Sequence, residues 1–454
     1  MTEEDGSFNI RVPEFATALY VYASEYAPLQ VAVATSDSTR QIAIKMLRDK
    51  FQPMYGRGTV YTAKGEALMD RFGVTVDNEI SSKLGGDMHT VMRSAALDGG
   101  ASMFIRGLNS ITSDAQPLII VDGIEQDMQR DRYSLHDGQF NNILANIAPD
   151  DVEKVTVLKN ATALYGARGA NGVVIIETKR GKSMATRIDA NISAGVTLKP
   201  QLPTLMNAEQ YRNYATELLG TVSGIADQAI DFHFLNDDPD GYYYHTYHNN
   251  TDWNNEVYRS AITQNYSINV QGGDDVGMYN LSVGYVDAQY SAKENGFNRM
   301  NLRFNTDISI LWNLRTKFDI SIARTANDVF DNGMPADFTT GTVVSPTALA
   351  MLKSPLVSPY QYNKLLNGGA GGYSSLLSGY DDIFSQYTNA YSLANPLSVL
   401  ENGNGNNKNR AENTYFNVHV EPVYSLTDNL KLTGLFSYTL NRNAQRYLDR
   451  KSVV

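Results

Sequence analysis

Apolar and polar residues alternate along most of the chain after Lys182. Residues 188–194, for example, place Ile188, Ala190, Ile192 and Ala194 on one side of an extended strand. The stretches NYSINVQGG, MYNLSVGYV, MNLRFNTDISI, KFDISIAR, YFNVHVEP and LKLTGLFSYTL repeat this pattern, and their opposite face carries charges and amides. A period of two predicts β-strands that have one apolar face and one polar face.

The connections between these predicted strands have very unequal lengths. GGDDVG, residues 272–277, is a tight turn, whereas residues 327–411 form a long polar insertion rich in Gly, Asn and Tyr. Short turns at one end and long loops at the other are typical of an outer-membrane β-barrel. A soluble β-sandwich is the alternative, because it shows a similar alternation. Strands of ten or more residues favour the barrel.

The first 182 residues have a different pattern. Residues 1–50 contain short β-rich runs and predict a small β domain, and residues 51–66, with Pro and spaced glycines, predict a linker. Residues 67–182 predict a mixed α/β region, with a short helix near 88–96, strands from Met103 and Pro117, and a helical turn at 141–147. GVVIIETK has the continuous apolar pattern of a strand that is buried on both faces.

The composition of the chain excludes several kinds of site and partner. The chain has 454 residues, a net charge of −11, abundant tyrosine and no cysteine. The negative charge argues against a nucleic-acid partner, and the absence of cysteine excludes disulfides and thiolate metal sites. No apolar run reaches the length of a membrane helix. The beginning, MTEEDGSFNIRVP, has neither the basic nor the apolar region of a signal peptide.

Motifs for enzymatic chemistry are missing from the sequence. His245 and His248 follow an acidic stretch at 236–241, but their spacing fits neither a zinc nor a calcium pattern, so we interpret this stretch as a polar loop. There is no phosphate-binding glycine loop and no nucleophile elbow. We therefore predict no catalytic residue, no metal and no cofactor, and a protein that is not an enzyme.

Four stretches of the sequence resemble one family. DDVEKVTVLKNATALYGARGANGVVIIETKRGK and MFIRGLNSITSDAQPLIIVDGI resemble plug motifs of the SusC/RagA-type TonB-dependent outer-membrane transporters. TDWNNEVYRSAITQNYSINVQGGDD resembles the entry into the barrel of that family, and NAEQYRNYATELL resembles its helix between the first two barrel strands. The resemblance implies a mainly β fold in four parts: a carboxypeptidase-regulatory-like β-sandwich domain at 1–50, a linker at 51–66, a plug at 67–182 and an incomplete antiparallel transmembrane β-barrel at 183–454.

The same resemblance implies particular roles for the residues in the plug motifs. The glycines allow positive φ and close backbone approach in a plug that is packed on all sides. Arg106 and Arg168 are expected to reach carboxylates on the barrel wall and so to lock the plug in the lumen. The predicted plug residues are Arg106, Gly107, Asp122, Gly123, Tyr165, Gly166, Arg168, Gly169, Asn171 and Gly172.

By resemblance, the function is TonB-dependent import of bulky nutrients, oligosaccharides or oligopeptides, across the outer membrane of a Gram-negative bacterium. The implied partners are the TonB energy-transducing complex, a SusD-like surface lipoprotein that acts as a lid, the ligand, and outer-membrane lipid. An aromatic loop is expected to stack on ligand or to sit as ordinary interfacial tyrosine, through Tyr242, Tyr243, Tyr244 and Tyr247.

The number of predicted strands differs from that of the family. Plugged transporters of this class have 22 strands, whereas seven or eight strand candidates are present here. We therefore expect a fragment or truncated gene product. Our alternative hypothesis is a remnant that transports nothing and acts at most as a binding or structural module.

Overall fold

A computed structural model describes residues 18–21, 29–32, 60–64, 74–83, 88–93, 96, 98–128, 134–136, 139–221, 232–274, 276–330, 345–369, 371–377, 393–401, 409–427 and 430–447. The chain divides into two compact units, residues 1–61 and 62–454. In the first unit, β1 (Ala18–Val21) pairs antiparallel with β2 (Leu29–Ala32). The rest of the domain predicted at 1–50 lies outside the described residues, and its assignment stays a prediction.

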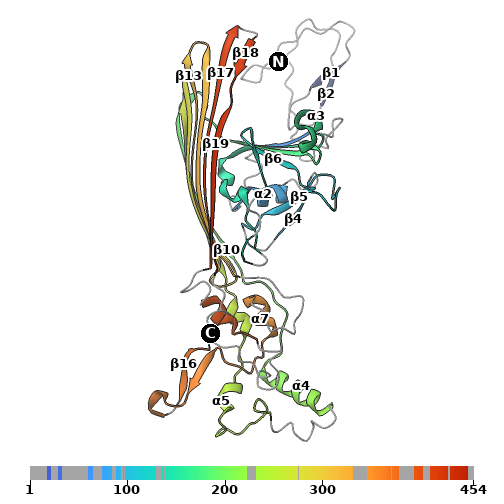
Figure 1. The fold of residues 1–454 in the computed structure, drawn as a ribbon, viewed down its shortest axis with the longest axis vertical. Helices are drawn as coiled ribbons and strands as arrows, with labels where there is room; N and C mark the ends of the chain where they lie inside the picture. Colours follow the sequence, from blue (N-terminus) through green and yellow to red (C-terminus); the bar gives the residue numbers. More distant parts are fainter. Residues whose placement is uncertain are drawn as a thin grey trace. The chain divides into compact units, whose positions relative to one another are not determined.

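The predicted plug is built on a five-stranded sheet (Figure 1). Its strands, in spatial order, are β3 (Val60–Lys64), β8 (Val152–Leu158), β9 (Val173–Thr178), β6 (Leu118–Val121) and β7 (Ile124–Gln126). All four residues of β6 are buried, and β9 lies parallel to β6 with four of its six residues buried. The apolar runs of the sequence therefore form the centre of this sheet. β3 falls within the stretch predicted as a linker, so part of that stretch is a strand.

Short elements surround the plug sheet. They are the helix α2 (Val76–Lys83), the hairpin β4 (His89–Met92) and β5 (Ala101–Phe104), and the single turns η1 (Ile143–Asn146), η2 (Pro149–Asp151), α3 (Thr162–Tyr165) and η3 (Gly166–Gly169). The helix predicted near 88–96 is wrong, because this stretch pairs as β4 with β5. The helix lies earlier, where Asp77 and Glu79 in its first turn complement the helix dipole.

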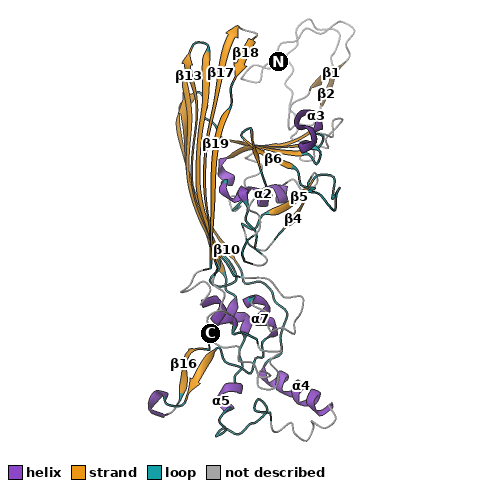
Figure 2. Ribbon diagram, viewed as in Figure 1, coloured by secondary structure: helices purple, strands orange, loops and turns teal. Residues whose placement is uncertain are grey.

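Eight antiparallel strands form a second sheet, which we call the wall (Figure 2). Neighbours along it are consecutive in the chain up to β14, and β18 and β19 both pair with β17. The strands are β10 (Met184–Thr197), β11 (Ala261–Gly273), β12 (Gly277–Gln289), β13 (Gly296–Leu311), β14 (Leu314–Asp328), β17 (Arg410–Thr427), β18 (Leu430–Thr433) and β19 (Phe436–Arg446). The predicted antiparallel series is confirmed, and within the described residues the sheet does not close into a barrel.

The wall buries its polar face. On β13 the side chains of Asn301, Arg303 and Asn305 are buried, whereas Met300 is 61% and Ile310 57% exposed. β12 repeats this arrangement, with Asn280 and Ser282 buried and Val283 and Tyr285 exposed. A soluble sandwich would bury its apolar faces instead. The alternation read from the sequence therefore belongs to a sheet of the barrel type, with apolar residues outside and polar residues inside.

The long connections at one end of the wall form a layer of their own. It contains α4 (Ala208–Thr221), α5 (Tyr244–Tyr247), α6 (Trp253–Val257), α7 (Pro346–Leu352), α8 (Pro396–Leu400), the turn η6 (Leu366–Gly369) and the hairpin β15 (Tyr360–Asn363) and β16 (Gly372–Leu376). The predicted helix at 207–219 is confirmed as α4. Trp253, Val257, Leu356 and Leu400 belong to the buried core of this layer. Within the described residues, no helix has both the length and the apolar character that crossing a membrane requires.

Gly172 offers a test of plug packing. It has φ +90°, and an added Cβ would lie 2.6 Å from Ile105 Cδ1 and 3.0 Å from the Leu158 carbonyl oxygen. We expect Gly172→Val to destabilise the plug by roughly 1–3 kcal/mol through overpacking, in addition to the backbone strain. Limited proteolysis of the folded protein in detergent would show faster cleavage of the plug.

Gly123→Ala is the matched control. Gly123 also has a positive φ, +83°, but its Cβ would meet nothing within 4 Å. Its substitution therefore carries the backbone strain without the steric clash, and we expect a smaller effect. Equal protease resistance of the Gly172→Val protein and the unsubstituted protein would contradict the prediction.

Candidate functional site

The buried face of the wall carries polar side chains in rows that cross several strands. The register aligns residues of β12, β13, β14 and β17 directly opposite one another. One row consists of Ser282, Arg303, Ser321 and Asn417, and the next consists of Asn280, Asn305, Asp319 and His419. These charged and amide groups require partners, since a buried polar group without a hydrogen bond is costly. The plug supplies many of them.

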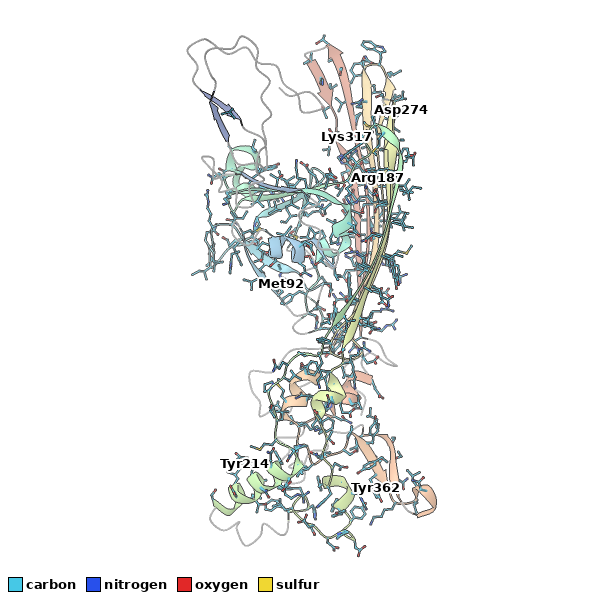
Figure 3. The ribbon with its side chains drawn as sticks, turned by 180° about the vertical axis from the view of Figure 1, so that it is seen from behind. Met92, Arg187, Tyr214, Asp274, Lys317 and Tyr362 are labelled. Atoms are coloured by element: carbon cyan, nitrogen blue, oxygen red, sulfur yellow. The ribbon has the colours of Figure 1, made fainter. Side chains whose placement is uncertain are left out.

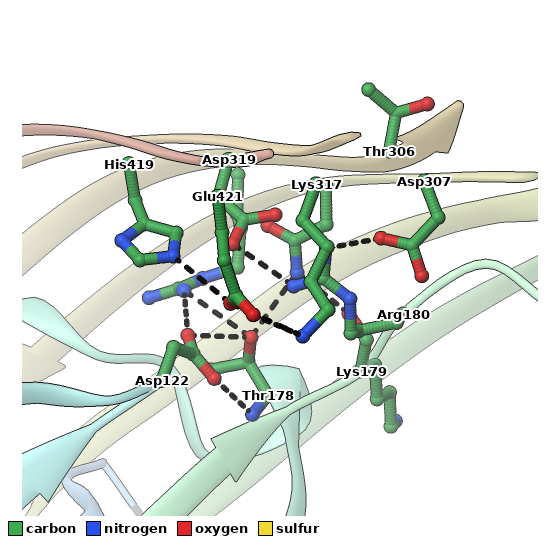
Figure 4. Close-up of polar contacts among 12 residues, drawn as sticks. Asp122, Thr178, Lys179, Arg180, Thr306, Asp307, Lys317, Asp319, His419 and Glu421 are labelled. Atoms are coloured by element: carbon green, nitrogen blue, oxygen red, sulfur yellow. Dashed lines mark hydrogen bonds and ion pairs between the residues drawn. The ribbon is translucent and has the colours of Figure 1, made fainter. Parts of the chain in front are cut away.

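Asp122 joins two strands of the plug to the wall (Figure 4). It follows β6 with φ +49°, and Gly123 continues the turn. Its Oδ1 accepts a hydrogen bond from the Thr178 backbone N–H at 2.8 Å, and its Oδ2 accepts one from the Thr178 hydroxyl at 2.9 Å. Arg303 Nη1 of the wall donates to the same Oδ2 at 3.0 Å. The positive-φ turn therefore aims one carboxylate at both partners.

Arg180 makes the reverse contact, from a plug cation to wall carboxylates (Figure 4). Its Nη2 donates to Asp307 Oδ1 of β13 at 2.6 Å, and its Nη1 donates to Asp319 Oδ2 of β14 at 2.9 Å. Beside it, Asn305 Nδ2 donates to the Lys179 carbonyl at 2.8 Å and to the Thr178 hydroxyl at 3.1 Å. The planar guanidinium suits this fork across two neighbouring strands.

A pair of plug acids extends the contact toward β11 and β12. Ser267 Oγ donates to Asp150 Oδ2 at 2.7 Å, and Ser282 Oγ donates to Asp151 Oδ1. Asn301 Nδ2 donates to Asp151 Oδ2 at 3.2 Å. Burial raises the pKa of Asp151 above its usual value, and the nearby positive charge of Arg303 opposes that rise. The wall thus surrounds this carboxyl with donors.

Arg299 of β13 binds the plug backbone instead of a carboxylate. Its side chain is fully buried, and its Nη1 donates to the carbonyls of Val74, Ala145 and Ile147 at 2.7, 3.1 and 3.3 Å. These carbonyls come from the segment before α2 and from the end of η1. One wall guanidinium therefore holds two plug segments that are distant in sequence. We call these contacts of Asp122, Asp150, Asp151, Arg180 and Arg299 the plug–wall interface.

Most of the predicted plug residues shape the plug itself. Arg106, Gly107, Gly123, Gly166 and Gly172 have positive φ. Two others make close plug contacts: Gly169 approaches the Ala161 carbonyl, and Tyr165 packs against the apolar cluster of β6 and β9. A further one, Asn171, donates from its Nδ2 to the Asp114 carbonyl at 2.7 Å. Of the predicted residues, Asp122 contacts the wall directly.

Arg106 and Arg168 are the two arginines predicted to lock the plug. Arg168 forms an ion pair with Glu125, which is also a plug residue, and Arg106 is exposed. That they reach a barrel wall stays a prediction. The arginines that do bridge plug and wall, Arg180, Arg299 and Arg303, were missed. A signal was present, because Arg299 and Arg303 occupy the polar face of a strand, where a charge needs a partner.

The aromatic loop divides into exposed and packed rings. Tyr242 is 80% exposed and Tyr243 is half-exposed, whereas Tyr247 is buried in the core of the layer. Tyr244 stacks on His248 with ring centroids 3.9 Å apart. His245 stacks on Tyr362 of β15, which Figure 3 labels in this layer. Tyr242 therefore offers the most open face for stacking on a ligand.

We expect Arg180→Ala to destabilise the docked plug by roughly 1–3 kcal/mol, since Asp307 and Asp319 would lose their cation in a largely buried site. The Lys182→Ala variant is the control, because Lys182 pairs with Glu153 on an exposed surface at 3.3 Å. Such a pair contributes about 0–1 kcal/mol. The measurement is the urea concentration at which half of the plug is released, detected by protease sensitivity, for each of the two variants. Identical midpoints for both variants would argue against the role of Arg180.

Substitutions of Tyr247 and Tyr242 distinguish a tyrosine that packs in the core from one that is free to contact a ligand. We expect Tyr247→Ala to destabilise the layer by roughly 3 kcal/mol, as aromatic-to-alanine changes do in a core. Tyr242→Ala should change stability by less than about 0.5 kcal/mol, because its ring is exposed. Proteolysis of the connection between β10 and β11 provides the measurement. The prediction is wrong if the Tyr242 variant is cleaved faster than the Tyr247 variant.

Comparison with known proteins shows similarity to TonB-dependent receptors. Residues 57–173 match the model of the TonB-dependent Receptor Plug Domain. The TonB-dependent receptor SusC of Bacteroides thetaiotaomicron is 28% identical over 382 residues, which cover 83% of this chain and 34% of the relative. A TonB-dependent receptor of Formosa agariphila is 28% identical over 338 residues, covering 70% of this chain and 31% of the relative. The chain thus spans about a third of the length of these relatives.

Solved structures agree on the fold. The RagAB peptide importer in its closed-closed state is similar with a TM-score of 0.65 and 21% identity, over 85% of this chain and 41% of that chain. A second RagAB structure, of the peptide transporter, gives a TM-score of 0.60 and 22% identity with the same coverage. The plug match and the SusC relative relate the sequence of this chain to TonB-dependent receptors, and the RagAB structures show a similar fold. The chain is therefore similar to the SusC/RagA type of TonB-dependent receptors.

Proposed function

We propose that this chain forms the plug and the first part of the wall of an importer in the bacterial outer membrane. Its cargo is a bulky nutrient, an oligosaccharide or an oligopeptide. A SusD-like surface lipoprotein covers the end with the long connections and delivers the cargo. The TonB complex pulls on the N-terminal side and displaces part of the plug. Transport then needs binding, release and movement, and no covalent chemistry.

The plug–wall interface is the observation that carries this proposal. A plug that must leave and return needs contacts that are specific and that can be separated in water. Charges and amides meet both needs, since their directional hydrogen bonds fix the docked position and each group regains hydration when the plug moves. A large apolar interface would resist such separation more strongly.

The outward face of the wall supports the membrane location. Ile192 is 75% exposed, and Ile188, Ile268 and Met300 are also exposed on this face. Such an apolar outer surface fits the hydrocarbon region of a bilayer. The relatives are named TonB-dependent receptors. An apolar outer face is what a membrane β-barrel presents to lipid.

Preventing plug movement tests the proposal. The chain has no cysteine, so Asp150→Cys with Ser267→Cys introduces one reactive pair where plug and wall meet. A short methanethiosulfonate reagent would bridge the two thiols. We expect the bridged protein to lose uptake of whichever glycan or peptide supports growth of cells carrying it, and a reductant to restore uptake.

A bridge within the wall is the matched control. Asn269 Nδ2 donates to Asn280 Oδ1 at 2.9 Å, and both residues lie on wall strands. Bridging Asn269→Cys with Asn280→Cys should leave uptake close to the rate of the reduced protein, because plug and wall stay free to separate. Unchanged uptake by the protein with bridged plug and wall would overturn the proposed movement.

A further inference from the structure

The basic side chains on the outward face of the wall gather at the end that carries the long connections. Thr414 of β17 lies opposite Arg324 of β14 on one side and opposite Arg442 of β19 on the other, so the three form one row. Further along β17, Arg410 lies opposite Arg446. We call Arg324, Arg410, Arg442 and Arg446 the arginine patch. On the part of the outward face that the structure describes, every Lys and Arg of the wall strands belongs to this patch.

The row of Arg324 and Arg442 lies at the boundary between apolar and polar outward residues. In the next row toward the short turns, Ile322 is 41% and Leu440 50% exposed. In the next row toward the long connections, the outward residues include the polar side chains of Asp287, Asn298 and Glu412. The two arginines therefore lie where the apolar surface ends.

The length of the apolar surface places this boundary at the level of lipid headgroups. On β13, outward residues run from Met300, in the row of Arg324, to Ile310 near the short turn. Ten steps of ~3.4 Å give about 34 Å along the strand, or about 26 Å across a membrane at a tilt of ~40°. The apolar band of a membrane barrel is ~25 Å tall, and arginine is tolerated on the outward face only near its edges.

The arginine patch has more positive than negative charge. Arg324 Nη2 pairs with Glu412 Oε2 at 3.2 Å. Arg410 Nε lies 3.3 Å from Asp328 Oδ1 and 3.6 Å from Glu412 Oε1. The two arginines of the patch on β19 are exposed and have no ion pair with a described residue. Two carboxylates thus serve four guanidinium groups, and the patch attracts an anion.

The spacing within the row suits a phosphate group. Arg324 and Arg442 are two strands apart, which is about 10 Å between backbones, and their long side chains can converge on one anion. A guanidinium binds phosphate through two parallel hydrogen bonds. The exposed Thr414 hydroxyl lies between the two arginines and can donate a further hydrogen bond.

The plug holds the end of β19 in position. His136 Nε2 donates to the Arg446 carbonyl at 3.0 Å, and the Leu135 backbone N–H donates to Gln445 Oε1 at 2.7 Å. β19 is also paired with β17 along its whole length. The backbone that carries the patch is therefore fixed before a ligand arrives, which lowers the cost of binding.

We propose that the arginine patch binds the phosphate of a membrane lipid headgroup, while the acyl chains of that lipid lie on the apolar band beside it. The inference rests on the membrane location in the proposed function and adds a specific lipid contact to it. Arg324, Arg442 and Thr414 contact the phosphate, and Arg410 and Arg446 add positive charge. A phosphate monoester carries about −1.5 to −2 charges and so matches the excess charge of the patch.

Native mass spectrometry of the detergent-purified protein tests the proposal, because it counts the lipids that stay bound when detergent is removed. Dioleoyl phosphatidic acid is the probe, and dioleoylglycerol has the same chains without the phosphate. We expect only the former to stay bound. Arg324→Gln with Arg442→Gln should weaken its binding about thirtyfold, which corresponds to ~2 kcal/mol, since each arginine near an anionic lipid surface contributes to attraction.

A charge-matched variant is the control. Lys182→Gln with Arg187→Gln removes the same charge, but Lys182 lies on the plug and pairs there with Glu153. Arg187, which Figure 3 labels, lies on the polar face of the wall, because its neighbour Gln271 lies opposite the buried Asn280. We expect this variant to bind phosphatidic acid like the unsubstituted protein. Equal loss in both double variants, or no loss in either, would overturn the patch as the binding site.

Competition with ammonium phosphate separates a lipid site from a site for free phosphate. An excess of ammonium phosphate should leave most of the phosphatidic acid bound, because the acyl chains also contact the apolar band. Complete displacement, or equal binding of dioleoylglycerol, would contradict the lipid headgroup assignment.

The uptake experiment fails or succeeds separately from this one. If the Arg324 and Arg442 variant binds phosphatidic acid normally while the plug–wall bridge still blocks uptake, the lipid site is wrong and the import function stands. If the bridge leaves uptake unchanged, the import function fails whichever lipid the wall binds.

Discussion

The structure depends on a sheet whose polar face is the buried one. Asn, Ser, Arg and Asp side chains cross the inside of the wall in aligned rows, and each needs a hydrogen-bonding partner in a place with little water. The plug provides partners of both signs: Asp122 for Arg303, and Arg180 for Asp307 and Asp319. A plug docked in another position would separate these pairs and leave buried charges without partners.

The polar contacts between plug and wall also determine how strongly the plug is bound. Breaking a buried ion pair is costly when one partner is removed, because the other charge stays buried. Movement of the whole plug is different, since both partners then meet water and recover hydration. Arg299 contributes to this balance in another way, because its three hydrogen bonds go to carbonyls of two separate plug segments. Those carbonyls are also readily solvated. The interface therefore fixes the docked position through directional polar contacts, and all of these polar groups can be hydrated if the plug leaves the wall.

The strands of the wall could be predicted from the sequence, but the plug residues that the wall contacts could not. Period-two alternation predicted the strands and their polar face, because side-chain direction follows directly from the strand backbone. The helix near 88–96 was predicted wrongly, since a short segment such as HTVM takes its conformation from pairing with β5. Arg303 and Asp122 are 181 residues apart, and Arg180 and Asp319 are 139 apart. Local patterns cannot join such distant residues, although a charge on the polar face of a strand does show that a partner must exist.

The layer of long connections has an apolar core of its own. The described members of its core lie between residues 215 and 400, and none of them belongs to the plug. Its segments are also joined by hydrogen bonds within the same layer, including those that Trp253 and Thr251 donate. A displacement of the plug would break the polar contacts on the wall and the small apolar cluster in which Val74 and Ala145 of the plug meet wall residues, but it would leave the core of the layer intact.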